Sequence, residues 1–247
     1  MTFSDRTCVV TGASRGIGRG IAEEFGSKGA NVVVNYHSAE GAAAETVEAV
    51  EAAGGEAIAV QADVTDPDDV AEMVEATHDA FGTAAVLVNN AGITADTKFG
   101  AMSQDDWNRV IDVNLGGTFN TTQAFFDDLK SANAGRLINI SSVIGKQGNY
   151  GQVNYAASKS GLFGMTRSLA LELAGHDATA NVVAPGYTKT DMILSVREDI
   201  KDRIREKIPL DRFAEISEIA CVVRFLASKD ASYVTGEIID VNGAMDL

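Results

Sequence analysis

A tyrosine and a lysine stand four positions apart in the stretch NYGQVNYAASKSG, which spans residues 149–161. Positions i and i+4 share one face of a helix, so the phenol of Tyr155 and the ammonium of Lys159 would lie side by side in a helix. An ammonium beside a phenol stabilises the phenolate and lowers the phenol pKa from its usual value of about 10. The spacing therefore indicates a phenol prepared to give up its proton, and an ordinary helix surface is the alternative interpretation of the pair alone.

Glycines recur in TGASRGIGRG at residues 11–20, between an apolar run and an amphipathic one. Gly12, Gly16 and Gly18 would allow a tight turn, close approach of the backbone to a pyrophosphate, and packing of the next helix on the sheet. The free N–H groups at the start of that helix favour phosphate. This order of strand, glycine turn and helix predicts a dinucleotide site.

The same glycines permit a second interpretation. GASRG at 12–16 matches the nucleophile elbow of hydrolases, with Ser14 as nucleophile. That fold needs strands and an oxyanion loop before the elbow, but only eleven residues precede Gly12, and none of the three histidines lies in a glycine-rich turn after a late strand. We therefore favour the dinucleotide site.

The residues after the second apolar run indicate which dinucleotide binds. NAD sites place an Asp or Glu there, which accepts a hydrogen bond from the ribose 2′-OH. This chain has Asn35, Tyr36 and His37 instead, while Arg15 in the glycine loop offers a fixed cation to a 2′-phosphate. The sequence therefore predicts NADP(H), and a solvated surface charge is the alternative interpretation of Arg15.

Short β-branched runs alternate with longer amphipathic stretches along the chain. The expected strands are 7–12, 31–36, 57–63, 86–92, 136–142, 179–186 and 237–243, and the expected helices are 17–28, 40–53, 67–81, 104–130, 153–174 and 216–227. Strands that are apolar on both faces and separated by helices predict a parallel sheet covered on both sides. The fold class is thus α/β, a single doubly wound Rossmann domain over 1–247 with a seven-stranded parallel sheet and helices on both faces. Residues 187–214 form an insertion that is expected to cover the substrate.

The charge balance is strongly acidic, with 35 Asp and Glu against 20 Lys and Arg and a formal net charge of -15. Such a surface repels nucleic acid and anionic membranes, so neither is an expected partner. It also suggests a protein adapted to high salt, where self-repulsion is screened. The absence of a bilayer-spanning apolar run and of a leader pattern predicts a cytoplasmic protein.

Two cysteines, Cys8 and Cys221, lie far apart and lack the spacing of metal ligands. Cys8 lies in an apolar strand-like run and Cys221 in a helix-like one. Both are therefore predicted to be buried small hydrophobes, and no metal site is expected.

Four motifs occur in one order: TGxxxGxG at 11–18, NNAG at 89–92, a serine at the end of the fifth expected strand, and YxxxK at 155–159. Together they resemble the short-chain dehydrogenase/reductase family over essentially the whole chain. The resemblance implies the catalytic residues Asn114, Ser142, Tyr155 and Lys159. It implies a cofactor site made of Gly12, Ser14, Arg15, Gly16, Ile17, Gly18, Asn35, Tyr36, Asp63, Val64, Asn90, Ala91, Gly92, Tyr155, Lys159, Pro185, Gly186 and Thr188.

The resemblance also implies a separate role for each of the four catalytic residues. Ser142 would donate a hydrogen bond to the substrate carbonyl, and Tyr155 would supply the proton while the cofactor supplies a hydride. Lys159 would hold the nicotinamide ribose, and Asn114 a water that relays protons. Family members commonly form homotetramers, so a homotetramer is expected.

For the cofactor, the same resemblance assigns Asp63 and Val64 to the adenine side and Asn90 to a place beneath the cofactor. Thr188, which follows Pro185 and Gly186, is assigned to the nicotinamide amide.

The stretches NISSVIGKQGNYGQVNYAASKSG and VVAPGYTKTDMI resemble the 3-oxoacyl thioester reductases of this family. Tyr150 and Tyr187 are similar to aromatics that line the short acyl pocket of acetoacetyl-CoA reductases, and Ser142 and Gln152 complete the implied substrate site. The resemblance thus favours an acyl-CoA substrate, with acetoacetyl-CoA reduced to (R)-3-hydroxybutanoyl-CoA for polyhydroxyalkanoate synthesis.

Besides another short-chain alcohol dehydrogenase of this family, two alternatives stay open. One is a 3-oxoacyl-[acyl-carrier-protein] reductase of fatty-acid synthesis, although the places where those enzymes carry basic residues hold Asn133 and His176 here. The other is a non-catalytic NADP(H) sensor, a role that usually follows loss of the tyrosine or the lysine, and this chain keeps both.

Overall fold

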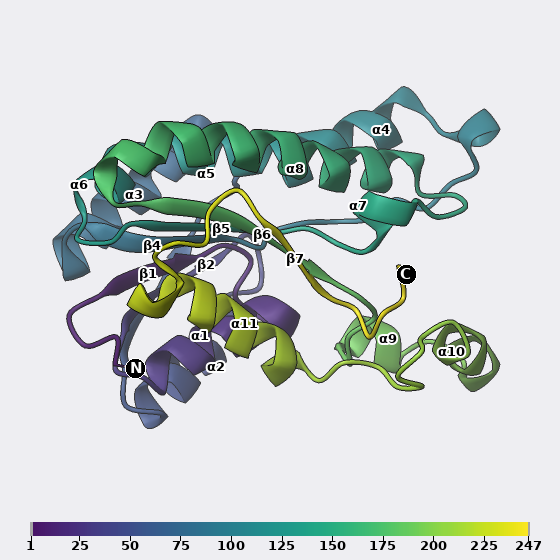
Figure 1. Ribbon diagram of the computed structural model, residues 1–247, viewed down its shortest axis with the longest axis horizontal. Coiled ribbons are helices and arrows are strands. Elements are labelled where there is room, and N and C mark those ends of the chain that lie inside the picture. The colour runs from purple at the N-terminus through teal and green to yellow at the C-terminus, as the bar shows by residue number, and fades with distance from the viewer. Residues whose placement is uncertain (1, 247) are drawn as a thin grey trace.

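The structure is a computed structural model that describes residues 2–246, with the side chain of Met192 outside the description. In this range one parallel sheet has the strand order β3-β2-β1-β4-β5-β6-β7 (Figure 1). Its strands are β1 (Thr7–Val10), β2 (Asn31–Tyr36), β3 (Glu56–Gln61), β4 (Ala84–Asn89), β5 (Arg136–Ile140), β6 (Thr179–Pro185) and β7 (Ile238–Val241). The predicted fold class is confirmed, and every expected strand overlaps an observed one.

Helices cover both faces of the sheet, with α1, α2 and α11 on one face and α3, α5 and α8 on the other (Figure 1). The α-helices are α1 (Gly16–Gly26), α2 (Glu40–Ala52), α3 (Pro67–Phe81), α4 (Gln104–Ile111), α5 (Gly117–Ala124), α6 (Phe126–Ser131), α7 (Ile144–Gln147), α8 (Val153–Leu173), α9 (Asp191–Leu194), α10 (Glu198–Arg205) and α11 (Ile216–Ala227). Short 3-10 turns lie at Phe99–Ala101, Ala174–His176 and Lys229–Ala231.

Alternate side chains of the central strand β1 enter two separate apolar clusters. Cys8 and Val10 join the cluster that contains Val223 of α11, whereas Val9 joins the cluster that contains Leu173 of α8. All five side chains are fully buried. Because full burial of a valine or leucine side chain contributes about 1.5–3 kcal/mol, both faces of this strand stabilise the fold, as its uninterrupted apolar run indicates.

The strand order reverses at β1, which pairs with β2 on one side and β4 on the other. The loops that leave β1 and β4 therefore diverge at the carboxyl ends of these strands. A doubly wound sheet binds ligands in the crevice that this divergence opens.

The expectation of one continuous helix over 104–130 is wrong. After α4 the chain forms a π-helical turn at Asp112–Gly116, and the helix breaks again at Phe125 before α6. Thr118 donates its hydroxyl to the carbonyl of Asn114 at 2.9 Å, and such bonds back to position i−4 bend helices. The wide turn accompanies complete burial of the Asn114 side chain.

Cys221 is exposed, so the prediction that both cysteines are buried is wrong for this one and right for Cys8. The buried side of α11 is formed by Ile219, Ala220 and Val223. Position 221 lies two residues after Ile219, about 200° further round the helix, and so faces water.

Residues 187–214 leave the sheet after β6 and return before α11, beyond the carboxyl ends of the strands (Figure 1). A parallel bridge joins Thr188 to Ala214 and pins the two ends of this segment together. Within it α9 and α10 carry the exposed side chains of Leu194 and Ile200. Among residues 2–246, no helix has both the length and the apolar character that crossing a bilayer requires.

Candidate active site

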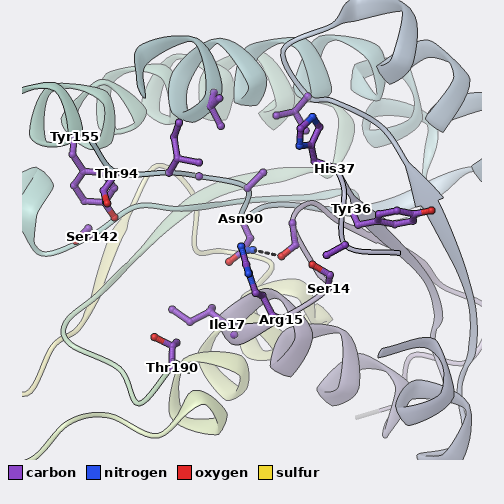
Figure 2. Close-up of a pocket in the computed structure, with 18 of the residues that line it drawn as sticks. Ser14, Arg15, Ile17, Tyr36, His37, Asn90, Thr94, Ser142, Tyr155 and Thr190 are labelled. Carbon is purple, nitrogen blue, oxygen red and sulfur yellow. Dashed lines mark hydrogen bonds between the residues drawn. The ribbon is translucent and has the colours of Figure 1, made fainter. Parts of the chain in front are cut away.

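A cleft of about 1390 Å³ runs along the carboxyl edge of the sheet (Figure 2). The predicted site residues that line it are Gly12, Ser14, Arg15, Gly16, Ile17, Asn35, Tyr36, Asp63, Val64, Asn90, Ala91, Gly92, Ser142, Gln152, Tyr155, Gly186, Tyr187 and Thr188. Those outside its lining are Gly18, Asn114, Tyr150, Lys159 and Pro185. The structure thus gathers residues from widely separated parts of the chain at the crevice that the topology predicts.

The glycine loop needs its glycines for two different reasons. Gly12 and Gly16 adopt φ angles of +61° and +59°, which residues with a side chain rarely adopt. Gly18 has an ordinary φ, but a Cβ there would lie 2.5 Å from both the Asn90 Nδ2 atom and the Gly12 carbonyl oxygen. Gly18 therefore keeps the loop and the start of α1 close to the end of β4.

Thr11 and Asn90 fix the glycine loop to β4. The Thr11 Oγ1 atom accepts from the backbone N–H groups of Asn90 and Ala91 at 2.9 and 3.0 Å. In return the Asn90 Nδ2 atom donates to the carbonyls of Thr11 and Gly12 at 2.9 and 3.1 Å. The sequence assigns no role to Thr11, although it is the first letter of the glycine motif.

Asn35 supports the same loop from the other side. Its Oδ1 atom accepts from the Gly12 N–H at 3.1 Å, and its Nδ2 atom donates to the Ala62 carbonyl at 3.1 Å. The residue is 1 % exposed, so its amide is already used within the chain. Asn35 lies at the cleft as predicted, but its contacts are those of a support for the loop.

Asp63 closes the far end of the cleft after β3. Burial raises the pKa of its carboxyl, but hydrogen bonds from the backbone N–H and the hydroxyl of Thr65, together with the charge of His37, outweigh burial and lower that pKa. The two Thr65 bonds are 2.9 and 2.8 Å long. Asp63 is therefore a fixed anion at neutral pH.

Asn114 and Ser158 join the π-helical turn to α8 and to the loop after β4. The Asn114 amide donates to the Ile93 carbonyl and to Ser158 Oγ, both at 3.0 Å, and its Oδ1 atom accepts from the Ile93 N–H at 2.8 Å. Ser158 Oγ donates to the Tyr155 carbonyl at 2.8 Å. These buried bonds hold the loop and the turn of α8 that carries Tyr155 in one arrangement. No local pattern in the sequence indicates this role for Ser158.

Tyr155 and Ser142 lie side by side in the lining of the cleft, and Lys159 lies next to Tyr155 but outside the lining (Figure 2). The Lys159 ammonium lies 5.8 Å from the centroid of the Tyr155 ring and donates to the Ile140 carbonyl at 2.9 Å. Burial lowers the pKa of this lysine to about 8. Helical spacing therefore does bring the phenol and the amine together, as the sequence predicts.

The pKa of the Tyr155 phenol, however, is raised. Burial is the main cause and the Asp96 charge adds to it, while a hydrogen bond with Ser142 acts in the opposite direction. The net direction is therefore opposite to the predicted lowering, because desolvation of the phenolate dominates.

A carboxylate that the sequence did not single out lies beside the cleft, bonded to the lining residue Gln152. Asp96 accepts from Gln152 Nε2 at 2.9 Å through both oxygens, and its charge contributes to raised pKa values of Tyr155 and Tyr187. Its partner lies 56 positions away in the chain, so no local pattern indicates the contact. Tyr150 stands apart from the cleft, 80 % exposed, with its ring 5.9 Å from the Lys98 ammonium.

The loop after β6 forms the remaining side of the cleft. Gly186 N–H donates to the Val241 carbonyl at 2.9 Å, and the Pro185 carbonyl accepts from the Val143 N–H at 2.9 Å. Thr188 donates its hydroxyl to the Gly186 carbonyl at 3.2 Å. This loop is thus tied both to β7 and to the segment that follows Ser142.

The residues present fit a dinucleotide. The positive φ angles of the glycine loop turn backbone towards the cleft, and Arg15 forms no hydrogen bond or ion pair through its side chain within residues 2–246. At Gly92 a Cβ would lie 3.3 Å from the Lys159 ammonium and 3.2 Å from the Asn114 Oδ1 atom, so the missing side chain leaves both within reach of the cleft. By contrast, no histidine in the described part of the chain hydrogen-bonds the Ser14 hydroxyl, which disfavours the hydrolase interpretation.

Comparison with known proteins agrees with this geometry. A family model described as enoyl-(acyl carrier protein) reductase matches residues 12–245. The chain is 45% identical over 241 residues to a 3-oxoacyl-[acyl-carrier-protein] reductase FabG of Staphylococcus epidermidis, covering 98% of this chain and 99% of the relative. It is 45% identical over 240 residues to the FabG of Aquifex aeolicus, covering 97% of each. A crystal structure assigned to a short-chain alcohol dehydrogenase from Sinorhizobium meliloti superposes with a TM-score of 0.93 at 38% identity, covering 99% of this chain and 97% of that one.

Proposed function

The chain belongs to the short-chain dehydrogenase/reductase family of oxidoreductases, and from that premise we propose that it uses NADPH to reduce 3-oxoacyl thioesters carried on acyl carrier protein. The relatives from Staphylococcus epidermidis and Aquifex aeolicus are both 3-oxoacyl-[acyl-carrier-protein] reductases, which supports the carrier thioester. This reverses the order in which the sequence alone ranked the two thioesters. Acetoacetyl-CoA is the second candidate, supported by the half-buried Tyr187 in the cleft.

The observation that carries the proposal is the pairing of Tyr155 with Ser142 on the wall of a cleft that fits a dinucleotide. NADPH, when bound, supplies the hydride. Ser142 holds the keto oxygen by a hydrogen bond, and the Tyr155 phenol gives its proton to that oxygen. A phenol whose pKa is raised by burial stays protonated at neutral pH, which suits a proton donor for the direction of reduction.

Lys159 and Asn114 act from behind this pair. The Lys159 ammonium can reach the cleft past Gly92 and would donate to the ribose on the nicotinamide side. The buried amide of Asn114 keeps the Ile93 backbone and the turn of α8 that carries Tyr155 in place. The family resemblance implies that the proton given up by the Tyr155 phenol is replaced from behind the pair, through a water held by Asn114.

Arg15 is the residue we propose for the 2′-phosphate, because its guanidinium lines the cleft without a partner in residues 2–246. Residues 187–214 supply Ile193 and Ser195 to the cleft lining, which supports the interpretation that this segment covers the substrate. A single catalytic domain and a homotetramer remain predictions, and light scattering on the purified protein tests the second.

Steady-state kinetics on matched substrates test the proposal. We expect oxidation of NADPH with acetoacetyl-carrier protein at a higher kcat/KM than with acetoacetyl-CoA, and slower turnover with NADH. Preference for the CoA thioester would move the assignment to the second candidate. Loss of both activities in a folded protein would remove the reductase function altogether.

A further inference from the structure

The segment beside the mouth of the cleft differs in charge from the rest of the protein. Residues 187–214 carry seven Lys and Arg against six Asp and Glu, whereas the rest of the chain carries 13 against 29. An acidic partner is therefore repelled by most of the surface and least by this segment. Because Ile193 of α9 lines the cleft, a partner bound to this segment would also lie next to the cleft.

Helix α10 is the outer part of this segment, further from the sheet than α9 (Figure 1). Its carboxylates are held by neighbouring cations, Glu198 by Lys201, Asp199 by Arg197 and Asp202 by Arg205. Arg203 of α10 and Lys207, in the turn that ends the helix, are exposed and form no side-chain hydrogen bond or ion pair within residues 2–246. These two cations are therefore available to a partner.

An apolar side chain lies on the same side of α10 as these cations. Ile200 precedes Arg203 by three positions and Lys207 by seven, so the three side chains share one side of the helix and its final turn. Ile200 is exposed, and so are Leu194 and Leu210, which flank α10 in the chain. We call Ile200, Arg203 and Lys207 the α10 face. An apolar centre with a polar and charged rim is the usual arrangement of a protein–protein interface.

We propose that the α10 face docks an acidic, partly apolar surface of the acyl carrier protein while the thioester of that carrier reaches the cleft. The inference rests on the carrier thioester of the proposed function, and it names the surface of this chain that meets the partner. Opposite charges on two proteins speed and orient their encounter, and exposed rim charges act mainly on the rate of association. Acetoacetyl-CoA presents no protein surface, so its turnover is independent of the α10 face.

Steady-state kinetics with two thioesters of the same acyl group test this proposal at saturating NADPH. At low salt Lys207→Glu should lower kcat/KM for acetoacetyl-carrier protein about three- to tenfold, mainly through KM, because an exposed attractive charge becomes a repulsive one. The kcat/KM for acetoacetyl-CoA should stay unchanged, which also shows that the variant is folded. The loss with the carrier should disappear at about 1 M salt, where charges are screened within about 3 Å.

Lys229→Glu is the matched control. Lys229 is also exposed and has no side-chain partner within residues 2–246. It lies in the turn after α11, next to Ser228, whose carbonyl accepts from Arg136 at the start of β5, and so at the opposite edge of the sheet. This variant has the same total charge as Lys207→Glu and should turn over both thioesters like the wild type.

Two more variants sharpen the test. Arg203→Glu should repeat the effect of Lys207→Glu. Glu206 is exposed beside Lys207 and has no ion pair within residues 2–246, so Glu206→Gln removes a charge that repels the carrier. This variant should raise kcat/KM for the carrier thioester and leave that for acetoacetyl-CoA unchanged.

The outcomes separate the two claims. An equal loss for both thioesters in Lys207→Glu, or an equal loss for the carrier in Lys229→Glu, would overturn docking at the α10 face and leave the proposed function standing. Unchanged carrier kinetics in Lys207→Glu and Arg203→Glu would do the same. A folded wild-type protein that does not reduce the carrier thioester at all would overturn the proposed function and this inference together.

Discussion

Two sides of the cleft are built in opposite ways. Behind the cleft lining, Asn114, Ser158 and Lys159 form a layer that we call the inner wall; it is buried, and its polar groups are hydrogen-bonded inside the chain. Gln152, which lines the cleft, and its neighbours Asp96 and Tyr150 outside the lining form a group that we call the outer rim; it is exposed or half-buried, and its contacts lie at the surface. The difference teaches that the groups proposed for proton transfer are fixed before any ligand arrives, whereas those beside the substrate can exchange partners with water.

Removing the phenol between these two sides should have the largest effect. Tyr155→Phe should lower kcat by about 10²- to 10⁴-fold, because a positioned general acid contributes that much to the rate. NADPH binding, followed by fluorescence, should change little, since the ring remains. Turnover within a few-fold of the wild type would take Tyr155 out of the mechanism.

Lys159→Met should separate activity from stability. Turnover should fall steeply, but the free energy of unfolding at pH 7 should rise, because a buried ammonium with a lowered pKa loses its hydration on folding. Since the folded pKa of about 8 lies below the ordinary value of 10.5, the unfolded chain binds more protons between these values, and wild-type stability increases with pH across that window.

Urea unfolding at several pH values checks this second prediction. The stability gap between Lys159→Met and the wild type should be widest below about pH 8 and should close towards pH 10.5. A variant that is less stable than the wild type at neutral pH would show that the ammonium contributes net stability to the inner wall.

Asn114→Ala should lower both stability and turnover, with a smaller effect on turnover than the two changes above. It leaves the Ile93 N–H and carbonyl without their side-chain partner in a buried setting, which costs about 1–3 kcal/mol per unsatisfied group. Turnover should fall as the loop after β4 loosens. Gln104→Ala, an exposed change on the preceding α4, is the control and should shift stability by less than about 0.5 kcal/mol.

Asp96→Asn probes the outer rim and should have the smallest effect. Its charge contributes to the raised pKa values of Tyr155 and Tyr187, so neutralising it should move the alkaline limb of the kcat/KM profile to lower pH. Because Asp96 is exposed, we expect a shift of less than about one pH unit that disappears at high salt. A large shift that salt does not reduce would mean that the outer rim is as enclosed as the inner wall.

The sheet could be predicted from the sequence because each strand carries its own signal. The apolar run of β1 and the helical spacing of Tyr155 and Lys159 are local patterns, and each has the predicted place in the fold. The π-helical turn at Asp112–Gly116 has no such pattern, and its buried Asn114 finds its partner at Ile93, 21 positions earlier.

The same reason explains the site residues that were missed or misread. Asp96 and Ser158 have roles only through partners that the fold brings to them. The raised pKa of Tyr155 depends on how deeply its ring is buried, which spacing along one helix cannot supply. Tyr150 is an aromatic residue of the kind that can line an acyl pocket, but its side chain lies at the surface.

The wide turn between α4 and α5 also has a consequence for how this chain can change. A π turn is equivalent to one residue inserted into an α-helix, so deleting one position from 112–116 would regularise the backbone. The five residues of the turn advance the helix by about as much as four α-helical residues would, so α5 would keep its orientation and Thr121 and Thr122 would stay in the interior. A one-residue deletion in the α-helical segments on either side would instead rotate the following helix face by about 100°, so a change of length should be tolerated best within 112–116, at positions other than Asn114.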